Sequence, residues 1–152
     1  MKEGQLWARY TWGLMHLVSI KIKEDDFTKE KQNILKIIMS ICQNLPCPHC
    51  RSHAIHFLNK SKEFKVISTK TQLIDFLFNF HNVVNIKVGK KCYDKSILKQ
   101  YDEVSLDKVI SIWNKYFKLF YVDQHTFKEE TQRSNVKKAI VNYLKTNSHI
   151  FI

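Results

Sequence analysis

Glycine and proline are scarce in this chain, which has three glycines and two prolines among its 152 residues. An all-β protein needs such residues at its many turns, so their scarcity argues against a β-sandwich or barrel and favours helices. The length suits one domain with its own hydrophobic core and is too short for two domains of ordinary size. We therefore expect one compact all-α unit, with room for a terminal appendage.

Targeting and membrane-spanning patterns are also missing from the sequence. The N-terminus lacks a charged segment followed by an apolar core and a small-residue cleavage site, so we expect no signal peptide. No apolar run approaches the length of a membrane span. We expect a soluble protein made in the cytoplasm. The four cysteines are too few to hold together a secreted chain of this length, so their spacing should indicate metal or redox chemistry.

Arginine is rare among the 25 basic residues, occurring only at Arg9, Arg51 and Arg133. The formal net charge of +11 makes nucleic acid the first acidic partner to consider. The lysines are scattered along the chain instead of forming one block, which is typical of a solvated surface. A bound pyrophosphate would use part of the excess charge. We therefore expect no dedicated nucleic-acid surface.

Apolar residues recur at steps of three and four in several segments, which is the period of an α-helix. The second of these helices has Thr28 as a plausible N-cap, and the fourth has Thr69 or Thr71. The expected helices cover, in order, residues 5–22, 27–44, 47–58, 71–88, 95–101, 106–121 and 136–144. Short connections favour antiparallel neighbours, and the pattern therefore predicts a helical bundle.

The most informative motif is Leu-Pro-Cys-Pro-His-Cys at residues 45–50. Two residues between Cys47 and Cys50 on a helical turn bring the sulfurs within disulfide reach, and Pro48 suits the first turn of a helix. A helix N-terminus stabilises a thiolate and so lowers the pKa of a cysteine placed there. Such a pair can cycle between a dithiol and a disulfide.

The same spacing is half of a zinc site, and His49, His53 and His56 lie close by in the sequence. One helix cannot easily direct these side chains at a single tetrahedral ion, and no second close pair of cysteines or histidines completes the site. We therefore expect no metal, with zinc as the alternative. A thioredoxin-like fold is disfavoured because the βαβ pattern around the motif is missing.

Two further clusters suggest where a dithiol could send its electrons. Trp12 and His16 share a face of the first helix, and His81 and Asn85 share a face of the fourth. Planar rings, amide donors and cations are what a large planar cofactor with a pyrophosphate needs. Taken singly, each of these residues is more typical of a core position or a solvated turn.

Together the motifs resemble those of the Erv/ALR family of FAD-linked sulfhydryl oxidases. Residues 9–16, RYTWGLMH, are similar to the family's Arg-x-Thr-Trp-x-x-x-His, and residues 46–50 to its Pro-Cys-x-x-Cys. Residues 81–94, HNVVNIKVGKKCYD, are similar to its His-Asn-x-Val-Asn-x-Lys-Leu-Gly-Lys-Pro-x-Phe-Asp. The segment 45–54 most resembles the compact oxidases of large DNA viruses, such as poxviruses.

The resemblance implies a four-helix bundle that holds FAD between its helices, usually as a homodimer. It assigns residues 1–104 to this domain and leaves residues 105–152 as a helical extension of unknown role. It also implies a location in the host cytoplasm or the virion. The implied partners are molecular oxygen and a dithiol protein that is thioredoxin-like or contains a Cys-x-x-Cys pair.

The resemblance also implies roles for individual residues. Cys47 would exchange disulfides with the partner, and Cys50 would lie beside the flavin, from which oxygen takes the electrons to give hydrogen peroxide. The residues placed around the flavin, its adenine or its phosphates are Arg9, Trp12, His16, His53, His81, Asn82, Asn85, Lys87, Lys90 and Tyr93.

The chain departs from the family pattern in several places. Leu45 replaces an aromatic residue, Lys91 replaces a proline, and no cysteine follows Tyr93, so the family's long-range structural disulfide is not expected. Cys42 and Cys92 are expected to be free thiols, with a bridge between them, or a shuttle role for Cys42, as the alternative. Two rival functions remain: a basic nucleic-acid-binding module with a structural zinc, and a scaffold that acts through residues 105–152.

Overall fold

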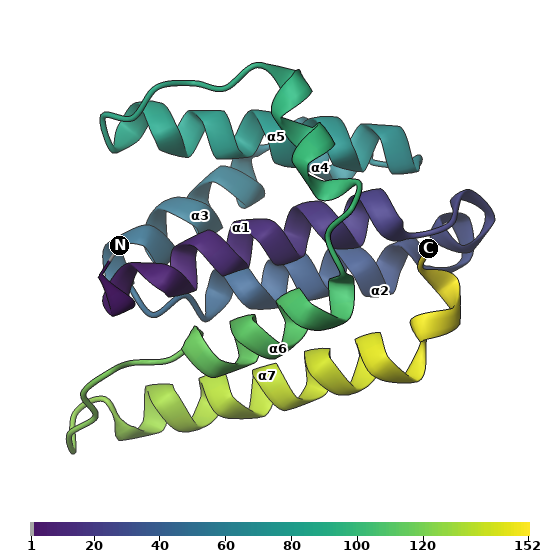
Figure 1. Cartoon of the computed structure of the whole chain (residues 1–152). Helices are drawn as coiled ribbons and strands as arrows, with labels where there is room; N and C mark the ends of the chain where they lie inside the picture. Colours follow the sequence, from purple (N-terminus) through teal and green to yellow (C-terminus); the bar gives the residue numbers. More distant parts are fainter. Residues whose placement is uncertain (1) are drawn as a thin grey trace.

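The computed structural model describes residues 2–152, which form helices joined by short connections (Figure 1). The α-helices are α1 (Glu3–Lys21), α2 (Glu24–Gln43), α3 (Pro48–Lys60), α4 (Lys62–Lys65), α5 (Lys70–Lys87), α6 (Leu106–Tyr116) and α7 (Phe127–Thr146). Two short 3-10 helices are η1 (Lys95–Tyr101) and η2 (Ser148–Ile150). Extended pairing among the described residues is limited to one bridge between Ile22 and Phe151. The predicted all-α class is confirmed.

The helices stack in layers around α1 and α2 (Figure 1). α1 packs against α5 and η1 on one side and against α6 on the other, while α2 contacts α3, α5 and α7. α3 and α5 therefore lie on one side of the central pair, and α6 and α7 lie on the opposite side. No helix among residues 2–152 is both long and apolar enough to cross a membrane.

Local sequence signals account for the start of the helices that build the site. α5 begins with a capping box, in which the Thr69 hydroxyl accepts from the Gln72 amide at 3.1 Å and the Gln72 side chain accepts from the Thr69 amide at 3.2 Å. Thr69, of the two predicted candidates, is therefore the cap. The chain leaves α5 through Gly89, whose φ of 75° is a left-handed conformation that glycine adopts without strain.

Three predicted helix boundaries were wrong. α2 begins at Glu24, because three acidic residues in its first turn interact favourably with the positive end of the helix, and Thr28 is not the cap. α6 ends at Tyr116, because Phe117 leaves helical geometry with ψ of 74° and is fully buried in the core. α7 begins at Phe127, ahead of the predicted Val136. The sequence did not indicate this earlier start, because the first turns of α7 carry no apolar repeat.

One hydrophobic core joins the family-like region to the C-terminal helices. Leu14 and Leu17 of α1 are fully buried together with Trp113 of α6, and Leu144 of α7 belongs to the same cluster. The indole Nε1 of Trp113 donates to the Thr11 hydroxyl at 3.1 Å. The division at residue 104 stays a prediction, and residues 105–152 cover one face of α1 and α2.

Candidate redox site

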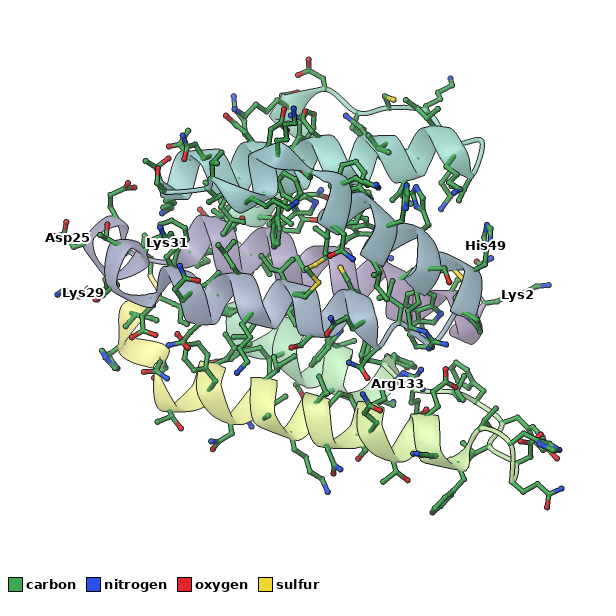
Figure 2. The ribbon with its side chains drawn as sticks, turned by 180° about the vertical axis from the view of Figure 1, so that it is seen from behind. Lys2, Asp25, Lys29, Lys31, His49 and Arg133 are labelled. Atoms are coloured by element: carbon green, nitrogen blue, oxygen red, sulfur yellow. A yellow bond between two sulfur atoms is a disulfide. The ribbon has the colours of Figure 1, made fainter. Side chains whose placement is uncertain are left out.

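Cys47 and Cys50 form a disulfide at the start of α3, with their Cα atoms 5.2 Å apart. Cys47 is the N-cap of the helix, and the Cys50 amide donates to the Cys47 sulfur at 3.2 Å. When the disulfide is reduced, this amide and the positive end of α3 stabilise a thiolate on Cys47. The neighbouring His49 lies on the outer surface, at the end of the molecule opposite Asp25 (Figure 2).

A cavity of about 640 Å³ opens beside this pair, between α1, α3, α5 and η1. Its volume lies in the range of pockets that hold small molecules and cofactors. Among the described residues that line it, Cys50 is included and Cys47 is not. All ten residues assigned to flavin binding line this same cavity: Arg9, Trp12, His16, His53, His81, Asn82, Asn85, Lys87, Lys90 and Tyr93. Their roles stay predictions, although the structure brings all of them together.

Aromatic rings from α1 and α5 form one wall of the cavity. The rings of Trp12 and His81 are parallel within 5°, with centroids 4.1 Å apart, and Phe80 meets Trp12 edge-on at 5.2 Å. The His16 Nε2 and His81 Nδ1 atoms share a hydrogen bond of 3.0 Å. The motif at residues 9–16, on α1, and the motif at residues 81–94, which begins on α5, therefore contact each other through their aromatic rings.

Both histidines of this wall are neutral at pH 7. Burial, followed by the charge of His81, lowers the pKa of His16 to about 3. Burial, followed by the charge of Lys90, lowers the pKa of His81 to about 4. Among the described residues, His16 Nδ1 is a buried polar atom without a hydrogen-bond partner. Such an atom is costly to bury, and a ligand with a polar group could satisfy it.

These lowered pKa values predict that the protein loses stability in mild acid. The unfolded chain binds protons at both histidines near the ordinary pKa of 6.5, whereas the folded chain binds them only near 3 and 4. Above pH 6.5 both histidines are neutral in the folded and the unfolded chain, and they cost no stability. As the pH falls from about 6.5 toward about 4, the unfolded chain takes up protons that the folded chain does not, so the free energy of unfolding decreases. The thermal unfolding midpoint should drop between about pH 7 and about pH 4.5, and should drop less in His16→Gln. The matched control is His125→Gln at an exposed turn; an equal drop in both variants and the parent would contradict the assignment.

The amide side chains of α5 hold the segment that closes the cavity. The Asn82 side chain donates to the Tyr93 carbonyl at 3.0 Å and accepts from the Tyr93 amide at 2.9 Å. This two-way contact fixes the chain after Gly89 against α5, with Asn85 buried just behind it.

Burial, then the charge of Lys87, lowers the pKa of His53 on the facing helix α3. The positive charges of Lys87 and Lys90 stand at the exposed edge of the same cavity.

Some cavity residues were not predicted from the sequence. Tyr101 of η1 lies with its ring 5.5 Å from His16, and Met15 also lines the cavity. Met15 stands at a variable position of the motif at residues 9–16, and Tyr101 lies outside every motif, so neither was singled out from the sequence. Within residues 2–152 the two remaining cysteines form no disulfide: Cys92 is exposed, and Cys42 is buried at the cavity wall, where burial raises its pKa to about 12. The predicted free thiols are confirmed.

These features fit a cofactor with a planar ring system and a pyrophosphate, as FAD has. The parallel rings offer a stacking wall, the unpaired His16 nitrogen offers a polar contact, and the lysines offer charge for phosphate groups. Among the described residues, no three His, Cys, Asp or Glu side chains are grouped so that they could hold a metal ion.

Comparison with known proteins points in the same direction. Residues 9–105 match the model of the protein family described as Erv1 / Alr. The chain is 31% identical over 100 residues to a putative FAD-linked sulfhydryl oxidase of Invertebrate iridescent virus 3, covering 65% of this chain and 68% of that protein. It is 31% identical over 104 residues to an FAD-linked sulfhydryl oxidase of African swine fever virus, covering 68% and 86%. It is 30% identical over 86 residues to a probable FAD-linked sulfhydryl oxidase of Acanthamoeba polyphaga mimivirus, covering 56% and 60%. No solved structure gives a significant match.

Proposed function

This chain belongs to the Erv1 / Alr family, and we propose that it is an FAD-linked sulfhydryl oxidase that forms disulfide bonds in dithiol proteins. The observation that carries the proposal is the disulfide at the start of α3, whose Cys50 borders a cavity lined by stacked aromatic rings and cations. FAD bound there would accept the electron pair of the substrate thiols and deliver it to oxygen, giving hydrogen peroxide.

The chain's own cysteines carry out the exchange with the substrate. A substrate thiolate attacks the Cys47 sulfur, the bond between Cys47 and Cys50 breaks, and Cys50 leaves as a thiolate at the cavity wall. The second substrate thiolate then attacks the mixed disulfide and releases Cys47 as a thiolate. The substrate gains a disulfide and loses two electrons, and the Cys47–Cys50 pair gains them. The position of Cys50 on the cavity side supports this assignment of roles.

Residues of α1 and α5, together with Lys90 just after α5, would hold the cofactor. Trp12 and His81 present the stacked rings, and His16 presents the nitrogen that lacks a partner. Lys87 and Lys90 supply positive charge for phosphate groups. The neutral state of the histidines avoids placing additional charge against a planar ring.

The purified protein should be yellow, and its colour should bleach when a dithiol is added without oxygen. The expected result follows because electrons from the thiols reach the cofactor through the cysteine pair, and admitting air should restore the colour. An absorption spectrum recorded before and after anaerobic addition of dithiothreitol tests the proposal. A colourless protein that binds no added FAD would refute it, as would a yellow protein whose spectrum does not respond to the dithiol.

We propose further that the physiological substrate is a thioredoxin-like or Cys-x-x-Cys protein and that the enzyme acts as a homodimer. The family resemblance supports both statements. The viral relatives support a location in the host cytoplasm or the virion. Analytical ultracentrifugation of the purified chain tests the dimer, and a single species of the 18.1 kDa monomer would argue against it.

A further inference from the structure

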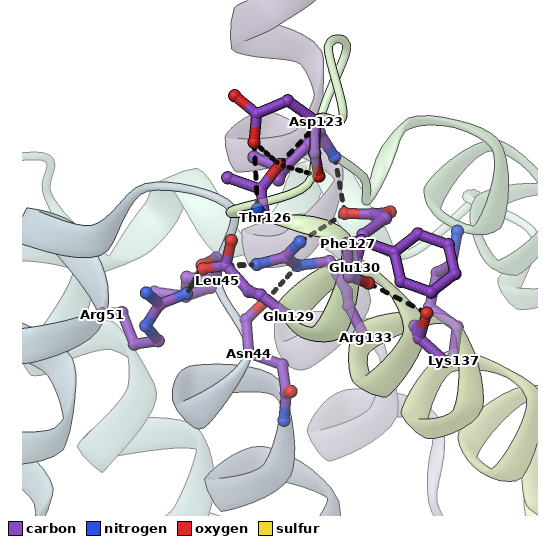
Figure 3. Close-up of polar contacts among 12 residues, drawn as sticks. Asn44, Leu45, Arg51, Asp123, Thr126, Phe127, Glu129, Glu130, Arg133 and Lys137 are labelled. Atoms are coloured by element: carbon purple, nitrogen blue, oxygen red, sulfur yellow. Dashed lines mark hydrogen bonds and ion pairs between the residues drawn. The ribbon is translucent and has the colours of Figure 1, made fainter.

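The C-terminal helix α7 reaches the segment that carries Cys47 through one buried arginine. Arg133 is fully buried, its Nε donates to the Asn44 carbonyl at 2.6 Å, and its Nη2 donates to the Leu45 carbonyl at 3.3 Å (Figure 3). Asn44 and Leu45 lie three and two residues before Cys47, between the end of α2 and the start of α3. Residue 133 lies outside the region that matches the family model, so this contact is not part of the motifs described above.

Two carboxylates of α7 compensate the charge of Arg133. Glu129 contacts its Nη2 at 3.3 Å, and Glu130 pairs with its Nη1. Glu129 also pairs with Arg51 of α3 at 2.5 Å, and Arg51 donates to the Leu45 carbonyl at 2.9 Å. The Leu45 carbonyl therefore receives donors from α3 and from α7, and a chain of ion pairs joins the two helices beside the disulfide.

The carbonyls held by Arg133 need partners that the helix cannot supply. The last carbonyls of an α-helix have no intrahelical donor, and both Asn44 and Leu45 are buried away from water. A guanidinium presents several donors in a rigid plane, so one Arg133 side chain can bind both carbonyls and both carboxylates at once. A lysine in its place has a single ammonium group on a flexible stem and cannot reproduce this arrangement.

We propose that Arg133 is a positioning residue for thiol–disulfide exchange: by fixing Asn44 and Leu45, it holds Cys47 at the N-terminus of α3. This inference rests on the proposed function. The Cys47 sulfur lies 3.2 Å from the Cys50 amide. Asn44 and Leu45 connect directly to Cys47 through Pro46, so holding their carbonyls also holds this sulfur near that amide. That contact stabilises the thiolate that Cys47 becomes after exchange, and it keeps the sulfur where an incoming thiolate attacks it.

The test compares two variants of α7 that each lose a contact with α2. Arg133→Met removes the donors beside Cys47, whereas Tyr143→Phe removes the hydrogen bond from Tyr143 to Glu30, 2.6 Å long, near the start of α2. Alkylation of Cys47 by iodoacetamide is followed against pH in the reduced protein by mass spectrometry. In Arg133→Met the midpoint of this profile should move upward, and kcat/KM for reduced thioredoxin should fall about tenfold or more. In Tyr143→Phe both should stay at the parent values, even where thermal stability falls.

Thermal unfolding and flavin content of both variants provide the structural control. The proposal is overturned if Arg133→Met keeps the parent alkylation profile, or if both variants change in proportion to lost stability. Arg133→Lys keeps the positive charge and a long aliphatic side chain, so it replaces Arg133→Met if the methionine variant does not fold. In Arg133→Lys the alkylation midpoint of Cys47 should move upward by less than in Arg133→Met. A midpoint equal to that of the parent protein would overturn the proposal. A parent protein that oxidises no thiols would refute the proposed function, whereas the alkylation profile still tests Arg133 because it needs no turnover.

Discussion

Replacing Cys50 with serine should abolish oxygen consumption with dithiol substrates while the protein keeps its flavin. Serine removes the sulfur at the cavity wall, so the disulfide with Cys47 cannot form and no electron pair can move from the substrate to the cofactor. The aromatic wall and the lysines that hold the cofactor remain unchanged. Cys47→Ser should have the same effect, because it removes the sulfur that the substrate thiolate attacks.

The measurement is oxygen uptake with reduced thioredoxin or dithiothreitol, together with the absorption spectrum of each variant. Cys92→Ser is the matched control, because Cys92 is exposed and forms no disulfide with another described residue; it should retain the parent rate. Full turnover by either variant of the pair would contradict the assigned chemistry. Loss of activity in Cys92→Ser as well would show that a third thiol takes part.

Trp113→Ala should lower the free energy of unfolding by roughly 3 to 5 kcal/mol, the cost of truncating a fully buried tryptophan. The Trp113 side chain has no exposed surface, stacks on Phe117 at 4.7 Å, and donates to the Thr11 hydroxyl. Its removal leaves a cavity between α6 and α1 and takes away the donor to the Thr11 hydroxyl, which keeps its own hydrogen bond to the Trp7 carbonyl. Because α1 also carries Trp12 and His16, flavin affinity should decrease along with stability.

Urea unfolding followed by circular dichroism measures this loss. Tyr121→Ala is the control, because that ring is 79% exposed in the connection between α6 and α7, and its removal should change stability by less than about 0.5 kcal/mol. If Trp113→Ala were as stable as Tyr121→Ala, residues 105–152 would not contribute to the shared core.

The redox pair could be predicted because its determinants lie within a few neighbouring residues. The spacing of Cys47 and Cys50, with Pro48 between them, specifies both a helix start and two sulfurs within bonding reach. The cap of α5 was narrowed to Thr69 or Thr71, and the structure selects Thr69, which forms a capping box with Gln72 three residues later. Helix boundaries were less predictable where tertiary packing acts against the local pattern. Phe117, for example, ends α6 because its side chain is buried in the core.

Residue types and local spacing alone established the helical class, the cysteine pair and the motifs that later gather around the cavity. Tertiary packing decided which distant residues meet: His16 with His81, Trp113 with Thr11, and Arg133 with the carbonyls before Cys47. The physical reason is that a helix start depends on neighbouring residues in the chain. The burial of Arg133 depends instead on how α7 lies against α2, and that follows from the whole core.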